Sequence, residues 1–350
     1  MNAEPALPLR RDFLKQAGAF GAAPVFATAL AAHPFVQTPV APATGSIARR
    51  PFGKSGIQVS ALGLGGHAIG LVKLESEAVQ IVRQAIDAGV TFMDNAWEYH
   101  DGLSEERMGK ALEGRRDQVF LMTKVCTHGR DKKVAMQQLE QSLKRLKTDT
   151  IDLWQVHECV YFNDPERHFA LGGVMEALDQ AKKDGKVRFV GFTGHKDPAI
   201  HLAMLAHDYP FDAVQMPLNP FDGRFKSFEQ LVLPELVKRG IAPIGMKSLG
   251  GTADSIKKGV LTVEEALRYV LSLPIASLVS GMDSIGVLQQ NVDIAKKFVP
   301  MSTDERDALR KRVAEHADDG RFELYKISAK FEGDTGRKQH GLPEQAKVPD

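Results

Sequence analysis

The sequence predicts a (β/α)₈ barrel, and three of its features carry that prediction. Eight short apolar runs recur between residues 61 and 280, most of them separated by a helical pattern. Several of these runs are apolar throughout, as parallel strands buried on both faces should be. No Gly-x-Gly-x-x-Gly motif follows a strand, so nothing favours an open dinucleotide-binding sheet. Eight β-then-α units in about 240 residues therefore favour a closed barrel.

The elements can be placed along the chain from their periodicity. The first predicted helix has apolar residues at i, i+3, i+4 and i+7 and stops at Gly89. An extended pair with a Gly-Lys-Ser-Gly turn, residues 47–52 and 57–60, precedes the first strand. The predicted strands are residues 61–65, 91–94, 119–124, 151–157, 187–193, 213–216, 242–247 and 276–280, and the predicted helices are residues 77–86, 135–146, 174–184, 199–207, 228–239 and 263–272.

The barrel is expected to occupy residues 47–300, with other segments on either side. Residues 1–32 combine a basic start, a weakly apolar stretch and small residues near its end, the pattern of a signal peptide. The apolar stretch is shorter than the roughly 20 residues of a membrane-spanning helix. Residues 33–46 form a Pro/Thr/Ala linker, and residues 301–350 form a helix followed by a polar tail with a mobile end.

The Arg-Arg-x-Phe-Leu-Lys pattern at residues 10–15 resembles a twin-arginine export signal, which carries folded proteins. The expected location is therefore the periplasm, with the twin-arginine translocase as a partner, or the cytoplasm if the signal is not used. The alternative is an amphipathic first helix of the mature domain, but the apolar residues show no helical stripe.

The composition points to small-molecule partners. Lys and Arg total 45 against 44 Asp and Glu, so no general attraction draws the chain to nucleic acid or an anionic membrane. The two cysteines cannot form a disulfide framework.

Four ionisable residues are predicted to meet at one end of the barrel. Asp94, Lys124 and His157 end three successive apolar runs, and Tyr99 follows Asp94 in the next loop. The carboxyl ends of barrel strands carry the reacting groups. A lysine close to a phenol stabilises the phenolate, so we expect a lowered pKa for Tyr99. The aspartate would orient the lysine, and the histidine would position a carbonyl oxygen. A lone strand-end histidine is usually a core residue, so the prediction depends on all four.

These residues lie in segments that resemble the aldo-keto reductase superfamily. Phe-Met-Asp-Asn-Ala-Trp-Glu-Tyr at residues 92–99, followed by Gly-Leu-Ser-Glu-Glu at residues 102–106, is similar to the family's F-x-D-T-A-x-x-Y-G…S-E segment. Thr123 and Lys124 resemble its third-strand T-K, residues 153–157 its L-x-x-x-H, and residues 53–65 its opening hairpin and first strand. The resemblance implies a catalytic tetrad of Asp94, Tyr99, Lys124 and His157. Tyr99 would be the general acid for a carbonyl that receives hydride from NAD(P)H.

The resemblance also implies a cofactor groove, from which the chain departs in places. Gly194 stands where the family has the Asn of G-x-S-N, and Met246 stands where an aromatic residue often stacks on the nicotinamide. Gly281 and Val287 replace cations that often hold a 2′-phosphate, so the expectation of NADP(H) over NAD(H) rests on the resemblance alone. The expected cofactor-binding residues are Thr193, Gln215, Met246, Lys247, Leu249, Gly250, Gly251, Gly281, Met282, Gln290 and Asn291.

The substrate pocket is expected to include Trp97, His100, Cys126 and Cys159. Each cysteine lies two residues beyond a tetrad member, so strand alternation would aim both at the mouth. A disulfide between them is an alternative to two unpaired thiols. His67, His128 and His195 lack the short spacing of a metal site, so no metal is expected.

The sequence therefore predicts a carbonyl reductase or alcohol dehydrogenase of this superfamily. A nucleotide-binding sensor or partner subunit with little turnover is the alternative, favoured by the altered cofactor positions. A hydrolase or metalloenzyme on the same fold is disfavoured, because Asp94 is the one strand-end carboxylate that stands out.

Overall fold

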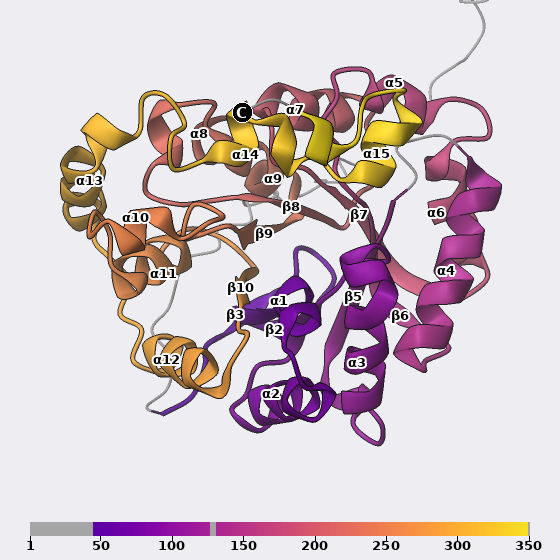
Figure 1. Ribbon diagram of the computed structural model, residues 1–350, viewed down its shortest axis with the longest axis horizontal. Coiled ribbons are helices and arrows are strands. Elements are labelled where there is room, and N and C mark those ends of the chain that lie inside the picture. The colour runs from indigo at the N-terminus through magenta and orange to yellow at the C-terminus, as the bar shows by residue number, and fades with distance from the viewer. Residues whose placement is uncertain (1–44, 127–130, 349–350) are drawn as a thin grey trace, which may run out of the picture. The chain divides into compact units, whose positions relative to one another are not determined.

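The computed structural model describes residues 45–126 and 131–348, and its eight parallel strands close into a barrel (Figure 1). Each strand pairs with its sequence neighbour, and the last pairs with the first. The predicted (β/α)₈ fold is confirmed. The strands are β3 (Leu62–Gly65), β4 (Phe92–Asp94), β5 (Phe120–Val125), β6 (Ile151–Val156), β7 (Val187–Thr193), β8 (Ala213–Pro217), β9 (Ala242–Met246) and β10 (Ser277–Gly281).

Helices surround the barrel close to their predicted positions. The predicted helix over residues 228–239 is divided into two, because Pro234 lacks the amide proton that a continuous helix needs there. The helices are α1 (Gly66–Leu71), α2 (Glu75–Asp87), α3 (Leu103–Ala111), α4 (Lys132–Leu146), α5 (Asp164–Phe169), α6 (Val174–Lys183), α7 (Pro198–Ala206), α8 (Phe228–Leu231), α9 (Leu233–Arg239), α10 (Asp254–Lys257), α11 (Val263–Leu271), α12 (Ile285–Lys296), α13 (Thr303–Arg312), α14 (Leu324–Ile327) and α15 (Asp334–Gln339).

Alternation along the strands divides the core into two layers. On β6, Leu153 belongs to the cluster inside the barrel, whereas Trp154 belongs to the cluster between the strands and the helices. Both residues are fully buried. The strands are thus apolar on both faces, which accounts for the continuous apolar runs of the sequence.

A short hairpin closes the N-terminal end of the barrel. Its strands, β1 (Arg49–Pro51) and β2 (Gln58–Ser60), pair antiparallel, and Phe52 follows β1 directly. The Phe52 ring lies with its centroid 4.6 Å from that of Phe120 and 5.4 Å from that of Phe189. Because Phe120 is the first residue of β5, this aromatic cluster lies at the N-terminal ends of the strands and plugs the barrel there.

The C-terminal segment (residues 317–348) belongs to the part of the chain that was expected to be a polar tail with a mobile end. Its described residues fold into short helices, and Phe322, Tyr325 and Lys326 are buried. Lys326 Nζ lies 2.7 Å from Asp222 Oδ1 and 2.9 Å from Glu323 Oε1. The polar composition did not reveal that this segment packs against the barrel, because only a few aromatic side chains and one buried ion cluster hold it there. Figure 1 shows α14 and α15, in yellow, close to the ends of β7 and β8.

Residues 1–44, which contain the predicted export signal and nearly all of the linker, lie outside the described residues, as does His128. Within the two described ranges, none of the helices combines the length and apolarity needed to cross a membrane.

We expect Phe52→Ala to destabilise the barrel by about 3–5 kcal/mol, because it empties a fully enclosed aromatic site. Urea denaturation followed by circular dichroism measures the change. Leu171→Ala, at a side chain that is 99% exposed, is the matched control and should change the unfolding free energy by less than about 0.5 kcal/mol. Equal effects of the two substitutions would contradict the role given to the hairpin.

Candidate active site

The four predicted residues stand at the C-terminal ends of neighbouring strands. Asp94 is the last residue of β4, Lys124 lies one residue before the end of β5, and His157 follows β6. Tyr99 begins the short 3₁₀ helix η1 (Tyr99–Gly102) after β4. Parallel closure brings these strand ends to one mouth, opposite the hairpin plug.

Lys124 is the centre of the arrangement. Its Nζ donates to Asp94 Oδ2 at 2.7 Å, to the Asn95 carbonyl oxygen at 2.8 Å and to the Tyr99 hydroxyl at 3.2 Å. These three acceptors match the three protons of an ammonium group, so the lysine has a single well-defined position. Asp94 and Lys124 are both almost fully buried, where an unpaired charge would be costly.

The pKa of Tyr99 shifts in the direction opposite to the one expected from the sequence. Burial raises this pKa well above its ordinary value, and the negative charges of Asp94, Glu98 and Glu158 raise it further. Burial also lowers the pKa of Lys124, although Asp94 opposes that shift. Desolvation of the phenol therefore outweighs the neighbouring ammonium, and Tyr99 holds its proton at neutral pH.

Two acidic residues lie beside the tetrad: Glu158 begins a loop that was expected to line the rim, and Glu98 was not foreseen as part of the site. Glu98 Oε1 lies 2.8 Å from His157 Nδ1, and Glu158 Oε1 lies 3.5 Å from His195 Nε2. The His157 ring stands edge-on to Tyr99, with centroids 5.6 Å apart. The sequence does contain a signal for both glutamates, because each is adjacent to a tetrad residue: Glu98 precedes Tyr99, and Glu158 follows His157.

Gln215 joins the tetrad from β8. Its Nε2 donates to Asp94 Oδ2 at 3.2 Å, and its Oε1 accepts from Gln155 Nε2 at 3.2 Å. Gln155 was not foreseen, since it lies within an apolar strand. Asp94 is thus held from two sides, by Lys124 and by Gln215.

The expected pocket residues are dispersed. The Trp97 indole donates to Gln141 Oε1 at 2.7 Å, and the Arg145 guanidinium lies over its ring, so Trp97 turns towards α4. His100 has a left-handed backbone with φ 53°, and its ring lies 4.7 Å from that of His67. His100 therefore stays beside the mouth, and Trp97 lies against the surrounding helices.

The two cysteines are free and buried, and they lie in different surroundings. Cys126 lies beside Glu98, whose charge adds to the effect of burial in raising the pKa of the thiol. Cys159 packs in the outer core between strands and helices. Strand alternation was expected to aim the Cys159 side chain at the mouth, and it does not. The reason is that Glu158 has a left-handed backbone, with φ 54°, which turns the chain after β6.

The nicotinamide end of the predicted cofactor groove has a tightly packed backbone. Thr193 is buried at the end of β7. A Cβ on Gly194 would lie 2.3 Å from the Cys159 carbonyl oxygen and 2.8 Å from His201 Cε1. The glycine is therefore required by packing, and an asparagine does not fit there.

The loop predicted to hold the pyrophosphate contacts the C-terminal segment. A Cβ on Gly250 would lie 2.2 Å from the Phe322 carbonyl oxygen, and one on Gly251 would lie 3.3 Å from Tyr325 Cδ1. Lys247 Nζ lies 5.3 Å from the centre of the Tyr325 ring. Met246 and Leu249, in the same stretch, are half-buried. The C-terminal segment thus covers the loop that was predicted to form the middle of the groove.

The adenosine end is open. Gly281 is exposed, and a Cβ on this residue would meet one described atom within 4 Å, Ala68 Cβ at 3.4 Å. Asn291 Nδ2 donates to Ser280 Oγ at 3.1 Å, and its buried Oδ1 has no hydrogen-bond partner among the described residues. Met282 is buried and Gln290 is exposed. The adenosine end of the predicted groove is therefore less crowded than its middle.

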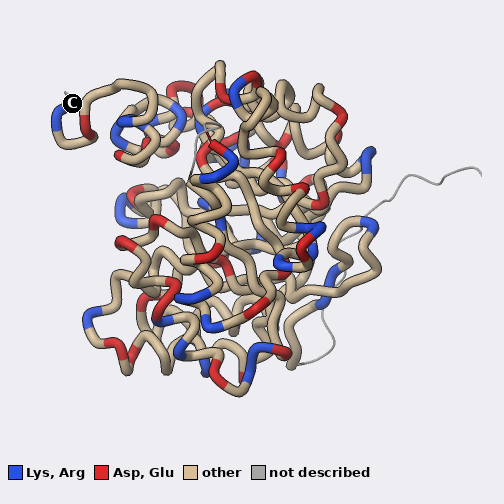
Figure 2. Tube along the Cα trace, turned by 90° about the vertical axis from the view of Figure 1, so that its right-hand side faces the viewer, with Lys and Arg blue, Asp and Glu red and all other residues tan. Residues whose placement is uncertain are grey.

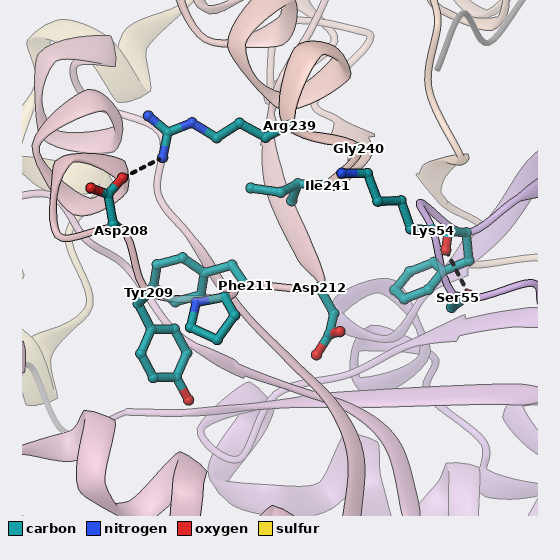
Figure 3. Close-up of a pocket in the computed structure, with 11 residues that line it drawn as sticks. Lys54, Ser55, Asp208, Tyr209, Phe211, Asp212, Arg239, Gly240 and Ile241 are labelled. Carbon is teal, nitrogen blue, oxygen red and sulfur yellow. Dashed lines mark hydrogen bonds and ion pairs between the residues drawn. The ribbon is translucent and has the colours of Figure 1, made fainter. Parts of the chain in front are cut away.

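A hollow lies at the end of the barrel opposite to the tetrad (Figure 3). It has a volume of about 380 Å³ and is lined by Lys54 and Ser55 of the hairpin, together with residues 208–212 and 239–241. These residues precede β8 and β9, so they belong to the N-terminal ends of the strands. Arg239 is paired with Asp208 there, at 3.3 Å. The hollow is remote from the tetrad and is not the candidate active site.

Charges of both signs alternate along the chain in Figure 2, without a large region of one sign on the face shown. This distribution agrees with the balanced composition.

With this geometry in place, comparison with known proteins identifies the class. Residues 61–259 match the model of the Aldo/keto reductase family. The match covers more than half of the chain, and the chain belongs to this family.

Relatives and solved structures agree. Aldo-keto reductase YhdN of Bacillus subtilis is 32% identical over 194 residues, which cover 51% of this chain and 55% of that protein. L-galactose dehydrogenase of Arabidopsis thaliana is 26% identical over 293 residues, covering 73% of this chain and 90% of that protein. The holo form of aldo-keto reductase AKR11C1 from Bacillus halodurans superposes with a TM-score of 0.64 at 25% identity, covering 76% of this chain and 96% of that one.

The buried His201 generates a pH-dependent stability. Burial lowers its pKa from 6.5 to about 3, so the folded chain keeps this ring neutral where the unfolded chain protonates it. The His201 contribution to the unfolding free energy is fully present above pH 6.5. As the pH is lowered from 6.5 towards 3, this contribution falls by at most about 1.4 kcal/mol per pH unit. We expect the unfolding free energy to fall more steeply between pH 7 and pH 5 in the wild type than in His201→Gln. Denaturant titrations at both pH values measure the difference, and parallel pH dependences would contradict it.

Proposed function

We propose that this chain is an NAD(P)H-dependent oxidoreductase that interconverts a carbonyl and an alcohol, with Tyr99 as the general acid and base. The observation that supports it best is the Lys124 ammonium, which contacts Asp94 and the Tyr99 hydroxyl at once. Family membership favours the same reaction. NADP(H) is the expected form of the cofactor, and the residues that would hold it are Thr193, Met246, the 247–251 loop, Gly281 and Asn291.

The tetrad supplies the proton that the reaction needs. A bound nicotinamide provides the hydride. Tyr99 stays protonated because burial raises its pKa, so its hydroxyl can donate as negative charge develops on a substrate oxygen. Lys124 then lies 3.2 Å from the phenolate oxygen and stabilises its charge. Asp94 keeps the ammonium in place, and in the oxidative direction the same phenolate accepts the proton back.

Tyr99→Phe should lower turnover by about 10²–10⁴-fold, because it removes the transferable proton and leaves the ring in place. Turnover is measured with NADPH and NADH on a panel of simple aldehydes and ketones, and dinucleotide binding by fluorescence titration. Binding should change little, because the substitution removes one hydroxyl at the mouth.

Tyr209→Phe is the matched control. Tyr209 lines the hollow at the opposite end of the barrel, where its hydroxyl donates to Asp179, and its loss should leave turnover unchanged. Full activity of Tyr99→Phe would refute the role given to this residue.

A nucleotide-binding sensor or partner subunit is the second candidate. It is favoured by the contact of Gly250 and Gly251 with the C-terminal segment, which covers the groove in this conformation. Dinucleotide binding without turnover, in both the wild type and Tyr99→Phe, would favour this candidate.

We further propose export by the twin-arginine route, from the pattern at residues 10–15. Arg10→Lys combined with Arg11→Lys should keep the full chain in the cytoplasm, because the pair is the recognised element of such signals. Fractionation of expressing cells, followed by immunoblotting, measures the location. Arg312→Lys with Arg321→Lys, at two exposed positions of the described chain, is the control. Unchanged periplasmic recovery of the first variant would rule out this route.

A further inference from the structure

Three side chains with metal-binding atoms meet at the barrel mouth. They are Glu98, His157 and Glu158, and one nitrogen or oxygen from each lies within 4.8 Å of the others. Glu98 comes from the loop after β4, whereas His157 and Glu158 come from the loop after β6. The barrel brings them together although Glu98 is far from the other two in sequence. A search for metal-binding motifs with short spacing therefore does not find this cluster.

His157 presents an unsatisfied nitrogen to this cluster. Its side chain is buried, with the residue 8% exposed, and Nδ1 makes no aligned hydrogen bond among the described residues. Nevertheless, Nδ1 lies 2.8 Å from Glu98 Oε1. Nδ1 and Oε1 are therefore close enough to bind a single ion.

Glu158 is held in place by further contacts. Its Oε2 accepts from the Gly333 backbone N–H at 2.8 Å, and its Oε1 lies 3.5 Å from His195 Nε2. Carboxylates that bind metals are commonly oriented by such outer partners. The contact with Gly333 also means that the C-terminal segment supports the cluster.

We propose that Glu98, His157 and Glu158 bind one divalent first-row metal ion, such as Zn²⁺, at the mouth beside Tyr99. One imidazole and two carboxylates are a suitable donor set for such an ion. Its charge offsets the repulsion of two carboxylates in a largely buried place. Three protein ligands leave a coordination position for water or a substrate oxygen. This site goes beyond the proposed function and reverses the expectation that no metal binds.

The test is metal binding by the full-length chain, independent of turnover. The protein is stripped with a chelator and dialysed, then titrated with Zn²⁺ by calorimetry and with Co²⁺ by visible absorption. We expect one ion per chain with a Kd of about 1 µM or tighter. Glu98→Gln and Glu158→Gln should each weaken binding by about 100-fold or more, since each removes a ligand charge.

Glu315→Gln is the matched control, because it alters a Glu–His pair, Glu315 and His316 at 3.4 Å, on the exposed surface. It should bind Zn²⁺ as the wild type does, and circular dichroism should show all variants folded. Tyr99→Phe should also keep the ion, which separates this proposal from the proposed reaction. Absence of stoichiometric binding by the wild type, or equal binding by Glu158→Gln, would overturn the site.

Discussion

The arrangement of the mouth depends on the buried ammonium group of Lys124. A charge in this position must be fully paired, because the surrounding strands exclude water. Asp94, the Asn95 carbonyl and the Tyr99 hydroxyl meet that requirement together. Satisfying the lysine therefore fixes the aspartate, the turn after β4 and the phenol at the same time. Gln215 extends the constraint to the opposite side of the barrel through its bond to Asp94.

Much of the fold was predictable because it follows from local rules. Each apolar run is a strand buried on both faces, and parallel strands separated by helices have few ways to close. The tetrad was predictable for a related reason, since a residue at a strand end is brought to the mouth by topology alone. Asp94, Lys124 and His157 needed no knowledge of side-chain packing.

Other features depended on contacts between distant segments, which a single sequence does not reveal. The C-terminal segment looks polar, yet Phe322 and Tyr325 bury it against the mouth, and Lys326 enters a buried ion cluster. Cys159 departed from strand alternation because Glu158 adopts a left-handed backbone. The pKa of Tyr99 was misjudged because the sequence showed the neighbouring lysine but not the extent of desolvation.

The hairpin plug also determines the route by which ligands reach the tetrad. Phe52 and its aromatic neighbours close one end of the barrel, so every ligand of the tetrad passes through the same opening. A molecule that reaches the tetrad and one that leaves it therefore share a single route.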